Sequence, residues 1–160
     1  HGNYICAMKI EDVIQTNFKS SQQKAIVNLR YTSNFLGNIQ NNFMAQYDLT
    51  MPQFNILRIL RGAKSALNVN SVKDRMVEKS PNTTRLMDKL IEKGLIERVR
   101  CNEDRRVVYV EITKKGLQLL VEIDIKLDAN SIMDLNLTDQ ESEILSDLLD
   151  KVRASFSKEI

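Results

Sequence analysis

Turn-forming and aromatic residues are scarce in this chain. Among its 160 residues there is no tryptophan, aromatic residues make up 6%, and there are only five glycines and two prolines. An all-β sandwich has many turns between its strands, so this composition disfavours it and is typical of a mainly helical protein. The length suffices for one hydrophobic core, and we expect either one domain or one small domain with helical extensions.

Catalytic and metal-binding residue types are also scarce. His1 is the one histidine, so no Ser/His/Asp or Cys/His arrangement can be built, and no Gly-rich phosphate loop occurs. Cys6 and Cys101 form neither a disulfide framework nor a CxxC ligand pair. We therefore expect no catalytic residues, no metal and no cofactor, and an enzyme is the least favoured class.

Long apolar runs are missing as well. No stretch of about 18 apolar residues occurs, and the N-terminus has no basic stretch followed by an apolar one. We therefore expect no membrane partner and a cytoplasmic protein. Residues 1–7 precede Met8, and we expect them to be foreign to a natural chain that starts at Met8.

Basic residues are concentrated in the middle of the chain, although the net charge is only +2. Residues 51–116 carry 15 basic and 8 acidic side chains, whereas residues 117–160 carry 4 basic and 10 acidic ones. A basic segment indicates that one module meets a polyanion such as nucleic acid, and a solvated charged face is the alternative interpretation.

Helical patterns fill the first half of the chain. Apolar residues recur at helical spacing over residues 20–47, which predicts one long helix or two helices separated near Gly37. Thr50 and Gln53 can form a capping box, which predicts the start of the next helix. Residues 69–76 are expected to form another short helix.

A further helix and two strands are predicted next. Ser80 is the expected N-cap of this third helix, with Pro81 at its first position, and Gly94 is expected to end it. Alternating apolar and polar residues predict strands over 95–100 and 107–112, joined by a polar hairpin loop. Three short helices followed by a hairpin are the arrangement of a winged helix-turn-helix, whose third helix enters the DNA major groove.

Capping patterns predict two helices in the last part of the chain. Thr113 can cap a helix that runs through Leu127, and Thr138 and Glu141 can form a second capping box for a last helix. The predicted fold class is therefore mainly α with a small β-hairpin wing, in which helical segments flank the winged helix-turn-helix.

Candidate DNA-binding residues lie in the third helix and at the tip of the wing. Those of the helix are expected at its exposed N-terminal end, where Asn can pair with adenine, Arg with guanine, and hydroxyl or ammonium groups with bases or phosphates; they are Ser80, Asn82, Thr83, Thr84, Arg85 and Lys89. In the wing, Asp104 can hold a neighbouring guanidinium extended, and a narrow minor groove attracts an inserted arginine; the wing candidates are Asp104, Arg105 and Arg106. A capped surface helix and a solvated basic turn are the alternatives.

Three stretches resemble the MarR family of bacterial transcription regulators. The wing matches the pattern D-x-R-x-x-x-[hydrophobic]-x-[hydrophobic]-T-x-x-G, "TRLMDKLIEKGLIER" resembles the recognition helix with its following strand, and "LTMPQFNILRIL" resembles the family's "LT-x-x-Q-[FY]" opening. The loop departs from the family by having Cys101-Asn-Glu where many members have proline, and the turn before Ser80 lacks a glycine.

The resemblance implies a homodimeric repressor that binds double-stranded DNA at a pseudo-palindromic operator. Residues 1–47 and 117–160 would then be dimerisation segments, and 48–116 the DNA-binding domain. It also implies a small aromatic effector between the dimerisation helices and the winged domain, for which the sequence supplies no residue. Thiol sensing in relatives uses a cysteine in the N-terminal helix, which neither Cys6 nor Cys101 matches. A winged-helix module that reads another protein rather than DNA remains the alternative function.

Overall fold

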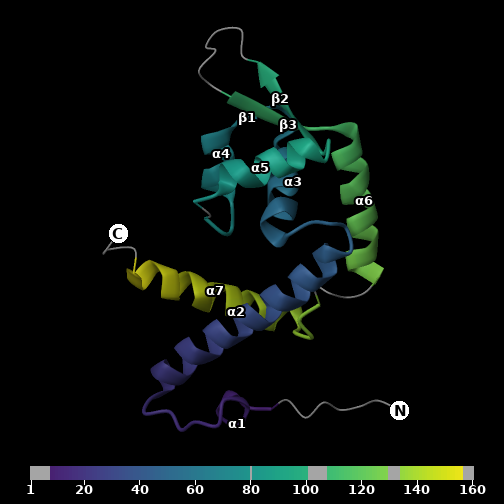
Figure 1. The fold of residues 1–160 in the computed structure, drawn as a ribbon. Coiled ribbons are helices and arrows are strands. Elements are labelled where there is room, and N and C mark those ends of the chain that lie inside the picture. The colour runs from purple at the N-terminus through teal and green to yellow at the C-terminus, as the bar shows by residue number, and fades with distance from the viewer. Residues whose placement is uncertain (1–7, 80, 101–107, 130–133, 157–160) are drawn as a thin grey trace. The chain divides into compact units, whose positions relative to one another are not determined.

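Seven helices and three strands make up the part of the chain that the computed structural model describes, residues 8–79, 81–100, 108–129 and 134–156 (Figure 1). The expected fold class, mainly α with a small sheet, is confirmed. The elements are α1 (Ile10–Val13), α2 (Ser21–Ala45), α3 (Met51–Ala63), β1 (Leu67–Asn68), α4 (Val69–Arg75), α5 (Thr83–Glu92), β2 (Ile96–Arg100), β3 (Val108–Ile112), α6 (Lys114–Ala129) and α7 (Asp139–Phe156).

Two compact units divide the chain, His1–Val121 and Glu122–Ile160. The first contains the helix-turn-helix and the sheet, and the second contains the end of α6 and all of α7. No helix in the described ranges is both long and apolar enough to cross a membrane.

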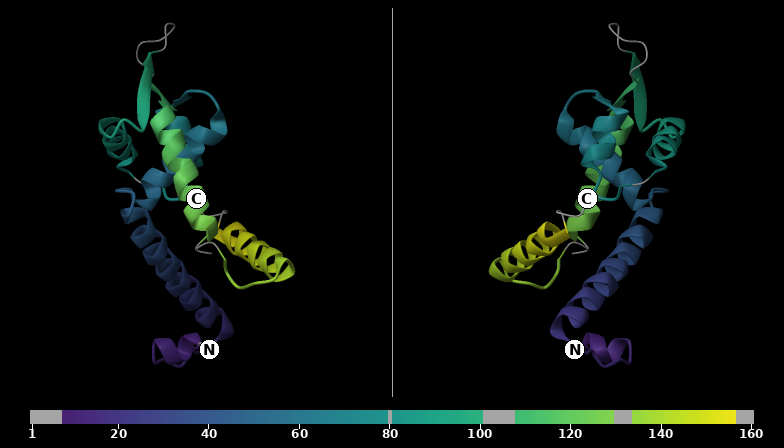
Figure 2. Two further views of the ribbon diagram at one scale, coloured as in Figure 1. Left: turned by 90° about the vertical axis from the view of Figure 1, so that its right-hand side faces the viewer. Right: turned by 90° about the vertical axis from the view of Figure 1, so that its left-hand side faces the viewer.

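The long helix α2 is continuous through Gly37 (Figure 2). Of the two alternatives, one helix or two, the structure therefore has one. The hydroxyl of its N-cap Ser20 accepts a hydrogen bond from the backbone amide of Gln23 at 3.1 Å. A single glycine costs a helix roughly 1 kcal/mol, which does not interrupt 25 residues with a cap and continuous backbone bonding.

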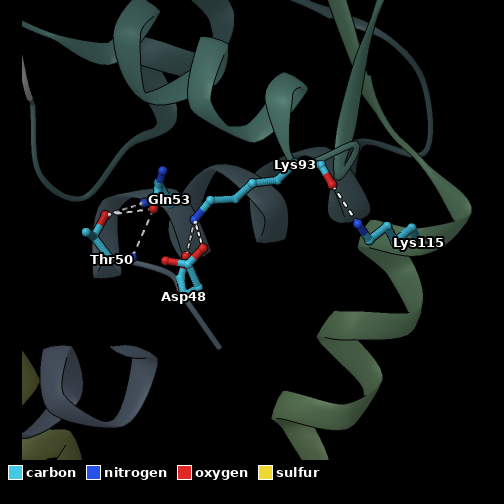
Figure 3. A network of polar contacts seen from close by, with 5 residues as sticks. All are labelled: Asp48, Thr50, Gln53, Lys93 and Lys115. Atoms are coloured by element: carbon cyan, nitrogen blue, oxygen red, sulfur yellow. Dashed lines mark hydrogen bonds and ion pairs between the residues drawn. The ribbon is translucent and has the colours of Figure 1, made fainter. Parts of the chain in front are cut away.

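A tight turn connects α2 to α3. The backbone amide of Leu49 donates to the carbonyl oxygen of Met44 at 3.2 Å, and both side chains are buried. Asp48 lies between them with a positive φ of 54°, the left-handed conformation typical of a helix C-terminus. The predicted capping box then starts α3: Thr50 Oγ1 accepts from the Gln53 amide, and Gln53 Oε1 accepts from the Thr50 amide (Figure 3).

The core of the first unit lies between α3, α4, α5 and the sheet. Helix α3 packs against α4, α5 and β3, because its apolar residues recur every three or four positions and form one buried face. The fully buried side chains of this core include Ile56, Leu57, Leu60, Val72, Met87, Leu90, Ile96 and Val110. This packing gives α5 a rigid support.

The sheet has three antiparallel strands in the order β1-β3-β2. The two strands of the predicted hairpin pair from Ile96 with Ile112 to Arg100 with Val108. Strand β1 was not predicted, since Leu67 and its neighbour are too short a stretch to show alternation. Only its pairing with β3 makes it a strand.

Candidate nucleic-acid interface

The turn between α4 and α5 is held from both sides. The backbone amide of Val77, just after α4, donates to Asn55 Oδ1 of α3 at 3.0 Å. The Thr83 hydroxyl at the start of α5 lies 3.6 Å from the sulfur of Met76, and both side chains are buried. The turn is therefore attached to α3 and to the core, and it places α5 without needing a glycine.

Helix α5 has one buried and one exposed face. Thr83, Met87 and Leu90 are spaced four and three residues apart, and all three are buried. The other face is polar and basic, with Asn82, Thr84, Arg85 and Lys89 exposed. Positions 82, 85 and 89 are neighbours on a helix surface because they are three and four residues apart. The structure thus brings three sequence-predicted residues together on one accessible face.

Two expectations for this helix were wrong. We expected Thr83 to be exposed, but its side chain is only 1% exposed and its hydroxyl contacts Met76. We also expected Pro81 as the first helical residue, whereas α5 begins at Thr83 with Asn82 as N-cap. Both differences have the same physical reason. The backbone of Asn82, with φ −97° and ψ 21°, is outside the helical region, so the helix begins one residue later, at Thr83, whose side chain is buried. Ser80, the expected N-cap, lies outside the described residues.

An ion pair ties α5 to the sheet. Arg98 of β2 donates through Nη2 to Asp88 Oδ1 of α5 at 2.6 Å. Both side chains are partly exposed, so the pair contributes little to stability. The pair connects α5 to the strand that leads into the wing. Sequence reasoning missed it, because nothing local marks two residues ten positions apart as partners.

The wing candidates Asp104, Arg105 and Arg106 lie outside the described residues. The strands on either side are described, and their last pair is Arg100 with Val108. The loop that carries the three candidates therefore connects two antiparallel strands, as expected for a hairpin.

Comparison with known proteins places this arrangement in a family. A model of the family described as transcriptional regulator SarA/Rot matches residues 38–123. The chain belongs to the SarA/Rot family. It is a winged-helix transcription regulator of the MarR/SarA type, so the resemblance to MarR regulators is confirmed.

Two curated relatives agree with this family. An uncharacterised HTH-type transcriptional regulator of Bacillus subtilis, YfiV, is 31% identical over 110 residues, which cover 67% of each chain. The HTH-type transcriptional regulator SarZ of Staphylococcus aureus is 27% identical over 120 residues, covering 73% of this chain and 76% of SarZ.

Solved structures share the fold of this SarA/Rot family member. A MarR-like regulator of Bacillus cereus has a TM-score of 0.73 at 21% identity, covering 85% of this chain and 98% of that one. A MarR transcription factor of Planctomyces limnophilus has a TM-score of 0.63 at 30% identity, covering 86% and 99%. MarR of Escherichia coli, in complex with operator DNA, has a TM-score of 0.72 at 24% identity, covering 86% and 99%.

Proposed function

We propose that this regulator is a homodimer that binds a pseudo-palindromic operator in double-stranded DNA, with one α5 helix in each of two major-groove half-sites. The observation that carries the proposal is the exposed face of α5, where Asn82, Arg85 and Lys89 stand together while the opposite face is buried. Support comes from E. coli MarR in complex with operator DNA and from S. aureus MepR in complex with DNA, which share this fold.

The proposed contacts follow from the chemistry of these side chains. The guanidinium of Arg85 can donate two hydrogen bonds to guanine O6 and N7, and the amide of Asn82 can pair with adenine N6 and N7. Thr84 offers a hydroxyl and a methyl group to a base edge or a phosphate. Lys89 lies one turn further along, and we assign it to a phosphate, which anchors the helix without reading sequence. Buried Thr83 is not part of this proposal.

The wing is proposed as the second contact. Arg106 would enter the minor groove while Asp104 holds its guanidinium extended, and Arg105 would contact phosphate. The basic balance of residues 51–116 supports a polyanionic partner for this part of the chain.

Exposed apolar helix faces support the proposed dimer. On α2, the side chains of Ile26 and Phe35 are 54% and 55% exposed, and on α7 no described residue is buried. The apolar side chains that α7 exposes are Ile144, Leu145, Leu148, Val152 and Phe156. Apolar faces of this extent need a partner surface, and a second copy also supplies the two-fold symmetry that a pseudo-palindrome requires. We therefore assign residues 1–47 and 117–160 to dimerisation and 48–116 to DNA binding.

The regulatory part of the proposal is repression in the cytoplasm, relieved by a small aromatic ligand, with no catalytic step. Repression is the role that the resemblance to MarR regulators implies, because a protein bound over a promoter blocks transcription. The neighbouring genes would identify the targets.

The proposed function is tested by DNA selection. The purified chain is incubated with a library of duplexes that have a random central segment, and the bound fraction is sequenced. We expect enrichment of two inverted half-sites about one helical turn, roughly 34 Å, apart. Sedimentation should show a dimer at micromolar concentration. A stable monomer that enriches no sequence would instead favour the winged-helix module that binds another protein.

A further inference from the structure

The end of helix α5 is attached to the turn between α2 and α3. Lys93, the residue that caps α5, places its ammonium nitrogen 2.9 Å from Asp48 Oδ2, and the same nitrogen donates to the Asp48 backbone carbonyl oxygen (Figure 3). The Lys93 side chain is 29% exposed, so its aliphatic stem is packed while its charged end reaches the turn, where the Asp48 side chain is 90% exposed. This contact joins residues 45 positions apart in sequence.

The same end of α5 is attached to the first turn of α6. Lys115 Nζ donates to the backbone carbonyl oxygen of Lys93 at 2.7 Å (Figure 3). The hydroxyl of Thr113, the residue before α6, donates to the backbone carbonyl oxygen of Gly94 at 2.8 Å. Carbonyl groups at a helix C-terminus have no partner within the helix and carry partial negative charge. The ammonium group of Lys115 and the hydroxyl of Thr113 therefore donate hydrogen bonds to the backbone carbonyl groups that follow the last turn of α5.

Gly116 allows this close approach. A Cβ atom at this position would lie 2.3 Å from the backbone oxygen of Leu95, a distance that real Cβ atoms do not show. The Gly116 amide also donates to Thr113 Oγ1 at 3.1 Å, so Thr113 caps α6 while it holds the end of α5. The T-x-x-G part of the wing motif thus connects the end of α5 to the start of α6.

We infer that these contacts form a joint, made of Asp48, Lys93, Thr113, Lys115 and Gly116, which sets the spacing at which two half-sites are read. The inference rests on the proposed dimer and its proposed DNA contacts. A helix is rigid over ten residues, so fixing the end of α5 against α2 and α6 fixes where its opposite end, with Arg85, is presented. The two lysines and Asp48 are positioning residues: they act through α5 and touch no base.

The conformation of Asp48 supports a role for its carboxylate. Its positive φ is unfavourable for a residue with a side chain, and glycine is the residue that this position favours. A glycine would relax the backbone but would remove the carboxylate that pairs with Lys93, leaving only the backbone carbonyl oxygen as its acceptor. Asp48 forms the ion pair with Lys93 although its backbone conformation is less favourable than it would be for glycine.

The test measures DNA affinity and half-site spacing together with stability. The probe is the duplex that the wild-type chain enriches, plus versions with base pairs inserted or deleted between the half-sites. Lys93→Met, Asp48→Asn and Asp48→Gly are titrated by fluorescence anisotropy. We expect affinity for the best spacing to fall about three- to tenfold, the scale of one exposed ion pair in each subunit, and the preference among spacings to become flatter. Melting temperatures should be unchanged for Asp48→Asn and unchanged or higher for Asp48→Gly.

A matched control removes a carboxylate outside the joint and outside the proposed dimerisation segments. Asp74→Asn takes one exposed charge from α4 and should leave the preference among spacings unchanged. Variants of Lys93 and Asp48 that keep the wild-type profile, or that weaken binding equally at every spacing in proportion to a lower melting temperature, would overturn the joint alone. If the wild-type chain enriches no duplex, the proposed function fails and the joint with it. Loss of affinity in Asp48→Gly but not in Asp48→Asn would also overturn it, because backbone freedom would then be the cause.

Discussion

Two glycines in helices illustrate how a residue's surroundings decide its effect. Gly62 of α3 and Gly116 of α6 have the same intrinsic helix propensity, yet a Cβ at Gly62 would meet nothing within 4 Å, whereas one at Gly116 would collide with the Leu95 carbonyl. We expect Gly62→Ala to raise the free energy of unfolding by about 0.5–1 kcal/mol and Gly116→Ala to lower it by about 1–3 kcal/mol. Urea denaturation of both variants checks this, and equal changes in the same direction would contradict it.

Arg85 and Lys89 are expected to differ in what they contribute to DNA binding. If Arg85 reads a guanine, Arg85→Ala should lose about 1–3 kcal/mol of operator affinity and relax specificity at one base pair of each half-site. Lys89→Ala should weaken binding to all sequences alike and reduce the salt slope by about 1 per subunit, because a phosphate contact carries no sequence information. Titrations on the selected duplex and on a scrambled duplex separate the two outcomes. Equal losses on both duplexes for Arg85→Ala would remove it from base reading.

At the scale of the element, the role of the wing can be tested by whether one substitution weakens or strengthens operator binding. If Asp104 holds Arg106 extended into a minor groove, Asp104→Ala should weaken operator binding although it removes a negative charge. A solvated basic turn predicts the opposite, because the more positive variant would bind as tightly or more tightly. Anisotropy titration decides between them, with thermal melts to confirm folding and Arg106→Ala as the reference for a complete loss of the contact.

Helix α7 begins with a capping box whose strength depends on pH. Glu141 accepts hydrogen bonds from the Thr138 backbone amide and hydroxyl, both at 2.9 Å, and these bonds lower the pKa of its carboxyl below the ordinary value of 4.5. A pKa that is lower in the folded state favours the folded state when the group is ionised. The contribution is therefore present above pH 4.5 and is lost as the pH falls through the lower folded value.

Replacement of this carboxylate tests the pH dependence. Glu141→Gln keeps an oxygen acceptor but removes the charge, so we expect it to be less stable than the wild type at neutral pH and equally stable in acid. Urea denaturation from about pH 6 to pH 3 measures the difference. Glu143→Gln, which removes a charge from the same helix but not from the cap, is the control. A difference between wild type and Glu141→Gln that persists in acid would contradict the assignment.

At the scale of the whole molecule, the uneven charge of the chain predicts a strong salt dependence. Residues 51–116 have an excess of basic side chains, and residues 117–160 an excess of acidic ones. If a dimer contacts on the order of 6–10 phosphates, its DNA affinity should fall about 10³–10⁵-fold between 50 and 200 mM salt. Anisotropy titrations over this range measure the slope. A flat response would favour the protein-binding alternative.

The local features of this fold were determined by the sequence itself. A capping box and an apolar helix face involve residues three or four positions apart, and the end of α5 is indicated by one glycine. Because these signals are local, the pattern of the chain alone indicated most helices, both hairpin strands and the winged helix-turn-helix. The same reasoning correctly predicted an exposed Asn82, Arg85 and Lys89, since their spacing places them on one helix face. Their roles in DNA binding stay predictions.

Tertiary structure decided what depends on distant partners. Strand β1 exists because it pairs with β3, and Thr83 is buried because Met76 lies beneath it. The contact of Arg98 with Asp88 and that of Lys93 with Asp48 join residues 10 and 45 positions apart. No local pattern marks such partners, because each side chain alone is an ordinary surface charge, and only the packing of α5 against its neighbours brings it to the group it binds.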